Sequence, residues 1–151
     1  MNSLNDAGLV ADPASGQTSY THRLGGLAVT GFIATLAAMV ATTLAAALAQ
    51  AGGVDFEVPD GGETIPLSGF AVVTGLFSFV GVLLAAAFLR WSARPAERFA
   101  WTAVSLTAIS LVPPLLSGAH TATITALLGL HLVAATVMIP TMARSLGTRT
   151  D

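Results

Sequence analysis

The sequence has no cysteine and no lysine, and only 9% of its 151 residues are charged. The absence of cysteine excludes disulfides, a thiolate nucleophile and thiolate-bound zinc or iron–sulfur clusters. The absence of lysine excludes a Schiff base and a P-loop. The formal net charge of −2 provides no basic surface of the kind that binds nucleic acid. Because a soluble domain carries about 25% charged residues, the composition also argues against a water-soluble protein.

Hydrophobic residues make up 54% of the chain, and the mean hydropathy is +0.77. They fall in four uncharged blocks, each long enough to cross a bilayer core, which needs about 20 residues. Because that core offers no water to the backbone, each block is expected to be a helix. The predicted helices span about residues 24–49, 67–89, 99–116 and 122–143. The predicted fold class is an all-α membrane protein, an antiparallel four-transmembrane-helix bundle with a short extracytoplasmic hairpin-like loop between helices 1 and 2.

The arginines predict the orientation of these helices. All six fall on one side of a four-helix topology, namely Arg23, Arg90, Arg94, Arg98, Arg144 and Arg149. The positive-inside rule then places both termini in the cytoplasm of a multi-pass protein of the cytoplasmic membrane. The polar residues 1–22 are expected to form a disordered cytoplasmic tail, residues 23–145 the four-helix domain and residues 146–151 a second cytoplasmic tail.

A cleaved signal peptide is the competing interpretation of the first block. Ala47-Leu48-Ala49 before Gln50 resembles a signal-peptidase site. The apolar stretch is longer than the roughly 7 to 15 residues of a signal peptide, however, and only one arginine precedes it. We therefore expect the first helix to be retained.

Small residues recur along the first helix, with Ala37, Ala41, Ala45 and Ala49 at a spacing of four. Ala34 and Ala38 widen this face. Small residues at such spacing let membrane helices approach closely. We expect the face to serve packing within the chain, and a dimer interface is the alternative.

The loop between the first two helices carries four acidic residues: Asp55, Glu57, Asp60 and Glu63. Val54, Phe56 and Val58 alternate with the acids, and the segment 59–62 has the composition of a turn. We expect a small hairpin on the outer face of the membrane. Carboxylates attract divalent cations, but their spacing is not that of an EF-hand. A solvated loop without metal is the expected state.

Proline marks two irregular points in the second half of the chain. Pro113 and Pro114 predict that the third helix is distorted or ends near Val112, because proline lacks the N–H that continues a helix. Pro140 removes the bond to the carbonyl of Thr136, so a kink is expected there.

One polar side chain per helix lies at a similar predicted depth: Thr35, Ser78, Ser110 and His131. We expect these residues to meet in an intramembrane polar layer. At this depth the His131 imidazole is expected to be neutral, with hydroxyls of neighbouring helices as partners. The layer is either a structural clasp or a polar spot in a binding pocket. Ligation of haem or a metal is a third reading, but only one histidine lies at depth, so no cofactor is expected.

Ionisable groups other than His131 are missing from the four blocks. Ion-coupled transporters depend on such groups within the membrane, so this class of function is disfavoured. A Ser-His-Asp triad is disfavoured because no acid lies near the depth of Ser110 and His131. An enzyme would have to use the outer acids with His120, which matches no known motif. We therefore expect that the protein is not an enzyme.

The second half of the chain resembles a known family within Trp101–Pro140. The shared elements are Ser110-Leu-Val-Pro-Pro114, Leu130-His131-Leu-Val-Ala-Ala135 and Ile139-Pro140. The family is an uncharacterised group of small four-helix integral membrane proteins of actinobacteria, with a domain of unknown function, and the resemblance covers about residues 24–145. It implies a four-helix membrane protein with an outer hairpin loop, and it implies no activity, substrate or cofactor.

Two functions remain open from the sequence. The first is a non-enzymatic accessory protein that packs against a second copy of itself or another membrane protein within the lipid bilayer. The alternative is a binder or transporter of a small hydrophobic molecule, with the predicted polar layer as its site.

Overall fold

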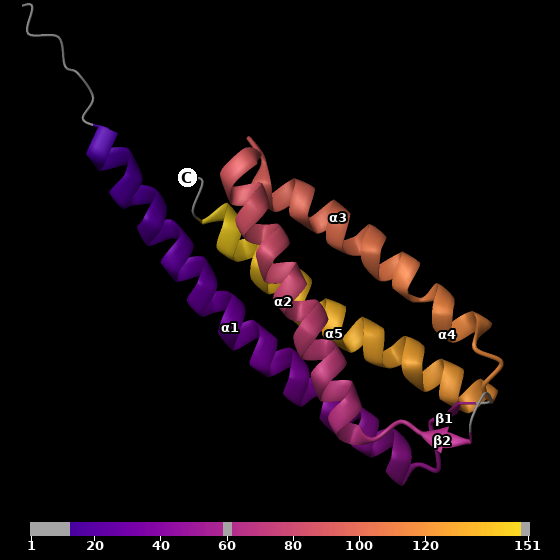
Figure 1. Ribbon diagram of the computed structural model, residues 1–151. Coiled ribbons are helices and arrows are strands. Elements are labelled where there is room, and N and C mark those ends of the chain that lie inside the picture. Colours follow the sequence, from indigo (N-terminus) through magenta and orange to yellow (C-terminus); the bar gives the residue numbers. More distant parts are fainter. Residues whose placement is uncertain (1–12, 59–61, 149–151) are drawn as a thin grey trace, which may run out of the picture.

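The computed structural model describes residues 13–58 and 62–148 and is mostly helical (Figure 1). The elements are α1 (Pro13–Ala51), β1 (Glu57–Val58), β2 (Glu63–Thr64), α2 (Leu67–Trp91), α3 (Pro95–Ser110), α4 (Val112–Leu116) and α5 (Thr121–Gly147). Four stretches are long and apolar enough to cross a membrane: Thr21–Ala51, Leu67–Trp91, Pro95–Leu116 and Thr121–Gly147. They coincide with the four blocks predicted from hydropathy, which confirms the helical character and the number of candidate spans.

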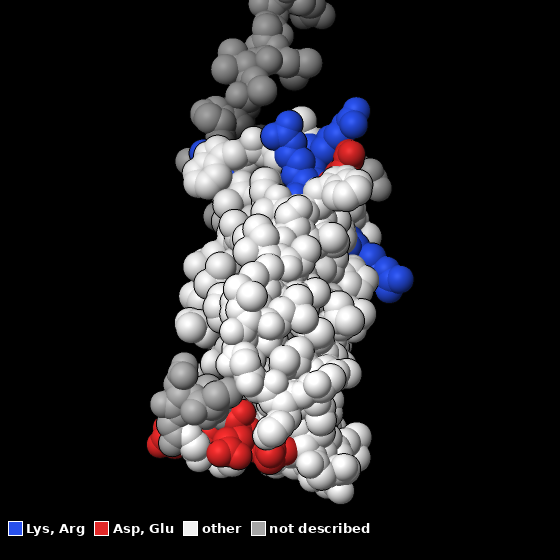
Figure 2. Space-filling model, turned by 90° about the vertical axis from the view of Figure 1, so that its right-hand side faces the viewer, with Lys and Arg blue, Asp and Glu red and all other residues white. Residues whose placement is uncertain are grey.

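The long helices lie side by side, with α5 packed against both α1 and α3 (Figure 1). The short α2–α3 connection, the start of α1 and the end of α5 lie toward one end of the molecule. The hairpin and the α4–α5 connection lie at the other. Figure 2 shows basic side chains in one half of the molecule and most acidic side chains at the opposite end. We call these the arginine end, after Arg90 and Arg94, and the hairpin end, after β1 and β2.

Large apolar side chains point outward, and small ones fill much of the interior. Exposed examples on α1 and α2 are Phe32, Leu44, Leu48, Leu76 and Phe77. Buried examples on the same helices are Ala34, Ala38, Ala46 and Ala85. A water-soluble protein has the reverse distribution, because burial of large apolar groups stabilises it. An apolar exterior with small residues between helices is typical of proteins that pack within lipid.

Two separate clusters form the core. The cluster nearer the arginine end includes Ala38 of α1, Phe99 of α3 and Met142 of α5. The cluster nearer the hairpin end consists of Ala46, Phe56, Phe70 and Leu130. Thr42 lies on α1 between Ala38 and Ala46, so the two clusters are separated at the level of Thr42.

The buried stripe of α1 differs from the predicted alanine face. The fully or nearly buried positions are Leu27, Ala34, Ala38, Thr42 and Ala46. In the predicted face, Ala37 is exposed, whereas Ala41, Ala45 and Ala49 are half-buried at the margin of the interface. The centre of the packing stripe is therefore one residue further along than predicted. Alanines occur on every side of this helix, so the sequence pattern did not distinguish its faces.

Glycine allows α1 and α2 to approach closely. A Cβ added at Gly31 of α1 would lie 2.7 Å from a methyl carbon of Val82 on α2. A Cβ added at Gly75 of α2 would lie 3.0 Å from the sulfur of Met39 on α1. The missing side chains at these two positions allow the short distance between α1 and α2. A larger residue at Gly31 would increase this distance.

Helix boundaries differ from the predictions at both ends of the described chain. The predicted disordered tail is wrong for residues 13–22, which form the start of α1, while residues 1–12 lie outside the described residues. Pro13 fits the first turn of a helix, and no further proline interrupts the chain before Pro59. At the other end of the chain α5 extends to Gly147, and residues 149–151 are outside the described part.

The predicted effect of proline is confirmed in the third span. A turn at Leu111 separates α3 from α4, next to the expected position, Val112. Pro113 and Pro114 cannot donate to the carbonyls of Ile109 and Ser110, so the regular helix ends there. Helix α5 continues through Pro140 without interruption.

The hairpin is anchored in the helices by one aromatic side chain. β1 and β2 pair antiparallel, with Glu57 opposite Thr64. Phe56, just before β1, is completely buried and meets Phe70 of α2 edge-on, with 4.8 Å between the ring centroids. Its φ of 51° lies in the left-handed region. That conformation costs about 1 to 2 kcal/mol, while burying a phenylalanine contributes about 1.5 to 3 kcal/mol, so burial outweighs the strain.

Candidate binding cavity

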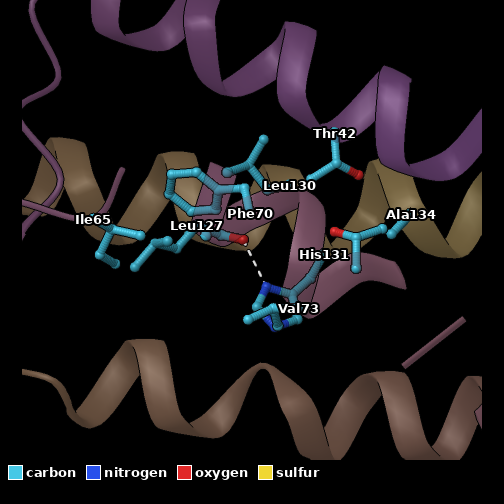
Figure 3. A pocket seen from close by; sticks show the side chains of 10 residues that line it. Thr42, Ile65, Phe70, Val73, Leu127, Leu130, His131 and Ala134 are labelled. Atoms are coloured by element: carbon cyan, nitrogen blue, oxygen red, sulfur yellow. Dashed lines mark hydrogen bonds between the residues drawn. The ribbon is translucent and has the colours of Figure 1, made fainter. Parts of the chain in front are cut away.

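An apolar cavity of about 280 Å³ lies at the level of Thr42 (Figure 3). Its wall is built from α1, α2 and α5, together with Ile65 before α2. Phe70 and Leu130 of the hairpin-end cluster form part of this wall, so the anchored hairpin also supports the cavity. Thr42 is nine residues from the end of α1, which corresponds to about 14 Å from the hairpin end.

His131 projects from α5, and its imidazole ring forms part of the cavity wall. Its Nδ1 lies 2.8 Å from the backbone carbonyl oxygen of Leu127, one turn earlier on the same helix (Figure 3). His131 is ten residues from Thr121, about 15 Å along the helix, so it lies at nearly the same depth as Thr42. The predicted depth of this histidine agrees with its place here, but its partner is its own helix rather than a neighbouring hydroxyl.

Many threonines elsewhere in the helices satisfy their hydroxyls locally. Six donate to the carbonyl four residues earlier: Thr30, Thr35, Thr43, Thr107, Thr125 and Thr141. Such local bonds are the usual solution for a hydroxyl in an apolar environment. Two threonines on the cavity wall lack such a local hydrogen bond.

Thr42 and Thr74 have hydroxyls without a hydrogen-bond partner in the described part of the chain. Thr42 is 3% exposed, and its Oγ1 is buried and unpaired. Thr74 on α2 also borders the cavity, and no bond to its hydroxyl occurs among the described residues. An unpaired polar group removed from water is destabilising by about 1 to 3 kcal/mol, so the buried hydroxyl of Thr42 requires an explanation, and the half-buried Thr74 lies beside the same cavity.

The four residues of the predicted polar layer do not all reach the cavity. Thr35 donates to the carbonyl of Gly31 on its own helix at 2.8 Å, and Ser110 donates to that of Thr107 at 2.7 Å. Ser78 is buried on α2 but is not on the cavity wall. Of the four, only His131 borders the cavity, because similar depth does not determine the direction in which a side chain points.

The sequence contained one signal for the residues that this prediction missed. Thr42 continues the four-residue spacing of Ala38 and Ala46, so a search for a polar residue on the buried stripe would have found it. Thr74 carries no comparable signal, because α2 is apolar on all sides.

The acidic residues of the hairpin loop lie apart from the cavity. Asp55, Glu57 and Glu63 are exposed, and Asp60 lies outside the described residues. Asp55 Oδ1 accepts hydrogen bonds from the Glu57 backbone N–H at 3.3 Å and from the Thr123 hydroxyl at 3.0 Å. The first of these bonds, then the second, lowers the pKa of the Asp55 carboxyl, and the nearby His120 contributes to the same direction. No cluster of three metal-binding side chains occurs among the residues that the structure describes.

Four apolar spans indicate a multi-pass membrane protein, here with a small cavity between its helices. A family described as "Family of unknown function (DUF6069)" matches residues 22–148, and the chain belongs to this family. No curated protein and no solved structure matches the chain. The family therefore adds no activity to what the geometry provides.

Proposed function

We propose that the protein binds a small, mostly apolar molecule in the cavity between α1, α2 and α5. The observation that carries this proposal is the presence of unpaired polar side chains, Thr42 and Thr74, on the wall of one apolar cavity. A site with apolar walls and a few polar groups is the usual form of a small-molecule site. In a bilayer no bulk water reaches this depth, so a bound molecule is the natural partner for these groups.

The cavity is small and borders the outer surface of the helices, so a ligand can enter it from the lipid. Its volume is about 280 Å³, slightly below the roughly 300–1,000 Å³ of sites for drug-sized ligands. Val73, on its wall, is 53% exposed, so the cavity borders the outer surface of the helices as well as their interior. A ligand that partitions into the membrane therefore has a lateral path to the site.

The accessory role expected first from the sequence receives less support. It relied on the alanine face of the first helix as a surface for a partner. Ala41, Ala45 and Ala49 are half-buried within the chain, so most of this face serves packing in the same molecule. A non-enzymatic role remains part of the proposal, because the described cavity wall carries no Asp, Glu, Lys or Arg that would act in acid–base chemistry.

We further propose that the arginine end faces the cytoplasm, with the protein in the cytoplasmic membrane as an antiparallel bundle. Arg90, Arg94 and Arg98 around the α2–α3 connection support this orientation through the positive-inside rule. The hairpin then lies outside the membrane, and the cavity lies near the middle of the bilayer core, which is about 30 Å thick.

Photolabelling in membranes tests the binding function. The probe is a small apolar aryl diazirine, and labelled peptides are mapped by mass spectrometry. We expect saturable labelling of peptides from α2 and α5 in the natural protein. Ala134→Phe fills the cavity and should abolish the saturable part, whereas the matched control Ala37→Phe adds the same ring at an exposed position and should preserve it. Labelling that never saturates, or that is equal in the two variants, would contradict the proposal.

A further inference from the structure

The hydrogen bond of His131 determines which of its ring nitrogens is free. A backbone carbonyl only accepts hydrogen bonds, so the Nδ1 atom 2.8 Å from the Leu127 oxygen must carry the proton. In the neutral imidazole the other nitrogen, Nε2, then has a lone pair and accepts hydrogen bonds. No bond to Nε2 occurs among the described residues.

The residues of the cavity wall therefore carry one acceptor and hydroxyls, and this combination selects among ligands. A hydrocarbon leaves Nε2 unpaired. An ether, ester or ketone brings only acceptor atoms, which satisfy a threonine hydroxyl but not Nε2. A hydroxyl group offers both kinds of atom, since its O–H is a donor for Nε2 and its oxygen is an acceptor for a threonine hydroxyl such as that of Thr74.

We propose that the ligand of this cavity is an apolar alcohol or phenol whose O–H donates to Nε2 of His131. This inference rests on the proposed binding function and specifies the chemical class of the ligand. Thr42 carries a second hydroxyl on the same wall, and its Oγ1 has no partner among the described residues.

The volume limits the part of the ligand that is enclosed. About 280 Å³ corresponds to the liquid volume of about nine water molecules, at roughly 30 Å³ each. The cavity thus holds one ring or a short chain with its hydroxyl. A longer chain would have to extend past the exposed Val73 into the lipid.

Competition among matched probes tests the inference on the full chain in lipid nanodiscs. The competitors of the diazirine label are 4-pentylphenol, 4-pentylanisole and pentylbenzene, compared at equal concentration in the bilayer. We expect 4-pentylphenol to compete about tenfold more effectively than the other two. One additional hydrogen bond increases the affinity by up to about tenfold. Thr74→Val, which keeps the side-chain shape, should reduce this advantage several-fold and leave competition by pentylbenzene unchanged.

The outcomes distinguish this inference from the proposed function. Equal competition by the three probes overturns the hydroxyl requirement and leaves the binding function intact. If no probe competes and labelling never saturates, the binding function itself fails. Hexadecanol as a fourth competitor separates two sources of the hydroxyl: its success assigns a membrane lipid alcohol, and success of 4-pentylphenol alone assigns a compact molecule.

A spectroscopic measurement gives an independent test that does not depend on labelling. In protein labelled with ¹⁵N-histidine, the Nδ1 signal of His131 should be that of a protonated nitrogen and the Nε2 signal that of an unprotonated one. Addition of 4-pentylphenol should shift the Nε2 signal, and addition of pentylbenzene should not. A proton on Nε2 in the probe-free protein would overturn the inference.

Discussion

Hydroxyl groups in these helices show how one residue type reaches two different states. Thr35 and Thr43 donate to the carbonyl one turn earlier, so they need no other partner. Thr42, adjacent to Thr43, has the same choice of rotamers but remains unpaired beside the cavity. The sequence shows that a threonine is present at each position, but it does not show which rotamer the surrounding side chains permit.

Asp55 provides a prediction at the same scale. Its pKa is lowered in the folded chain, first by the bond from the Glu57 backbone N–H and then by the bond from Thr123. A lowered pKa in the folded state stabilises the fold above the ordinary value of 3.8, and this stabilisation is lost as the pH falls toward the lowered value. We expect the Tm in detergent to fall as the pH is lowered from 6 to 3, and to fall less in Asp55→Asn.

The matched control for this prediction is Glu63→Gln, which removes another exposed carboxylate of the same loop. The control should follow the pH dependence of the natural protein. The difference at Asp55 should be small, no more than a few degrees, because an exposed group is well screened by solvent. If the Asp55 and Glu63 variants show the same pH dependence, the bonds to Asp55 do not couple protonation to stability.

At the scale of elements, the seam between α1 and α2 depends on the close approach at Gly31. The run of alanines in the first block predicted close packing, and the structure has it, but on a stripe shifted by one residue. The shift brings Ala38 and Thr42 to the interface and leaves Ala37 exposed. Rotation of a helix about its axis is decided by its neighbours when small residues occupy all its faces.

Gly31→Ala is expected to destabilise the protein, whereas Gly129→Ala is not. An added Cβ at Gly31 would lie 2.7 Å from a Val82 methyl carbon, and overpacking of this kind destabilises by about 1 to 3 kcal/mol. At Gly129, within α5, an added Cβ has no atom within 4 Å, so the higher helix propensity of alanine should be neutral or stabilise by up to about 1 kcal/mol. Thermal unfolding in detergent compares the two variants.

The double variant Gly31→Ala with Val82→Ala identifies the cause. Shortening Val82 removes the two methyl groups that the new Cβ would contact. The double variant should therefore be less destabilised than the sum of the two single variants. Strict additivity would show that the loss at Gly31 does not arise from contact with α2.

At the scale of the whole molecule, the separation of charge between the two ends is the property that bears on orientation. Acidic side chains gather at the hairpin end, and the arginines of the α2–α3 connection lie at the other (Figure 2). Between the ends, the exposed side chains of the spans are mainly large and apolar. This distribution matches a protein whose waist is in lipid and whose two ends meet water.

The absence of cysteine makes the orientation directly testable. We introduce Thr64→Cys on β2 or Ala93→Cys in the α2–α3 connection, both exposed positions. A membrane-impermeant maleimide applied to intact cells should label the cysteine at position 64. It should label the cysteine at position 93 only after the membrane is permeabilised. Labelling in the reverse order would invert the proposed orientation. Labelling of both positions in intact cells would contradict a crossing of the membrane by α2, the one span between them.

The sequence by itself determined the number of candidate spans, the separation of charge and the break near Pro113. These are local properties, because the length of an apolar run, the positions of its charges and the missing N–H of a proline do not depend on neighbours. Only the tertiary structure decided that Thr42, Thr74 and His131 share one cavity, while Thr35, Ser78 and Ser110 do not. Which side chains meet depends on how each helix is rotated against the others, and helices that are apolar on every side carry little sequence information about that rotation.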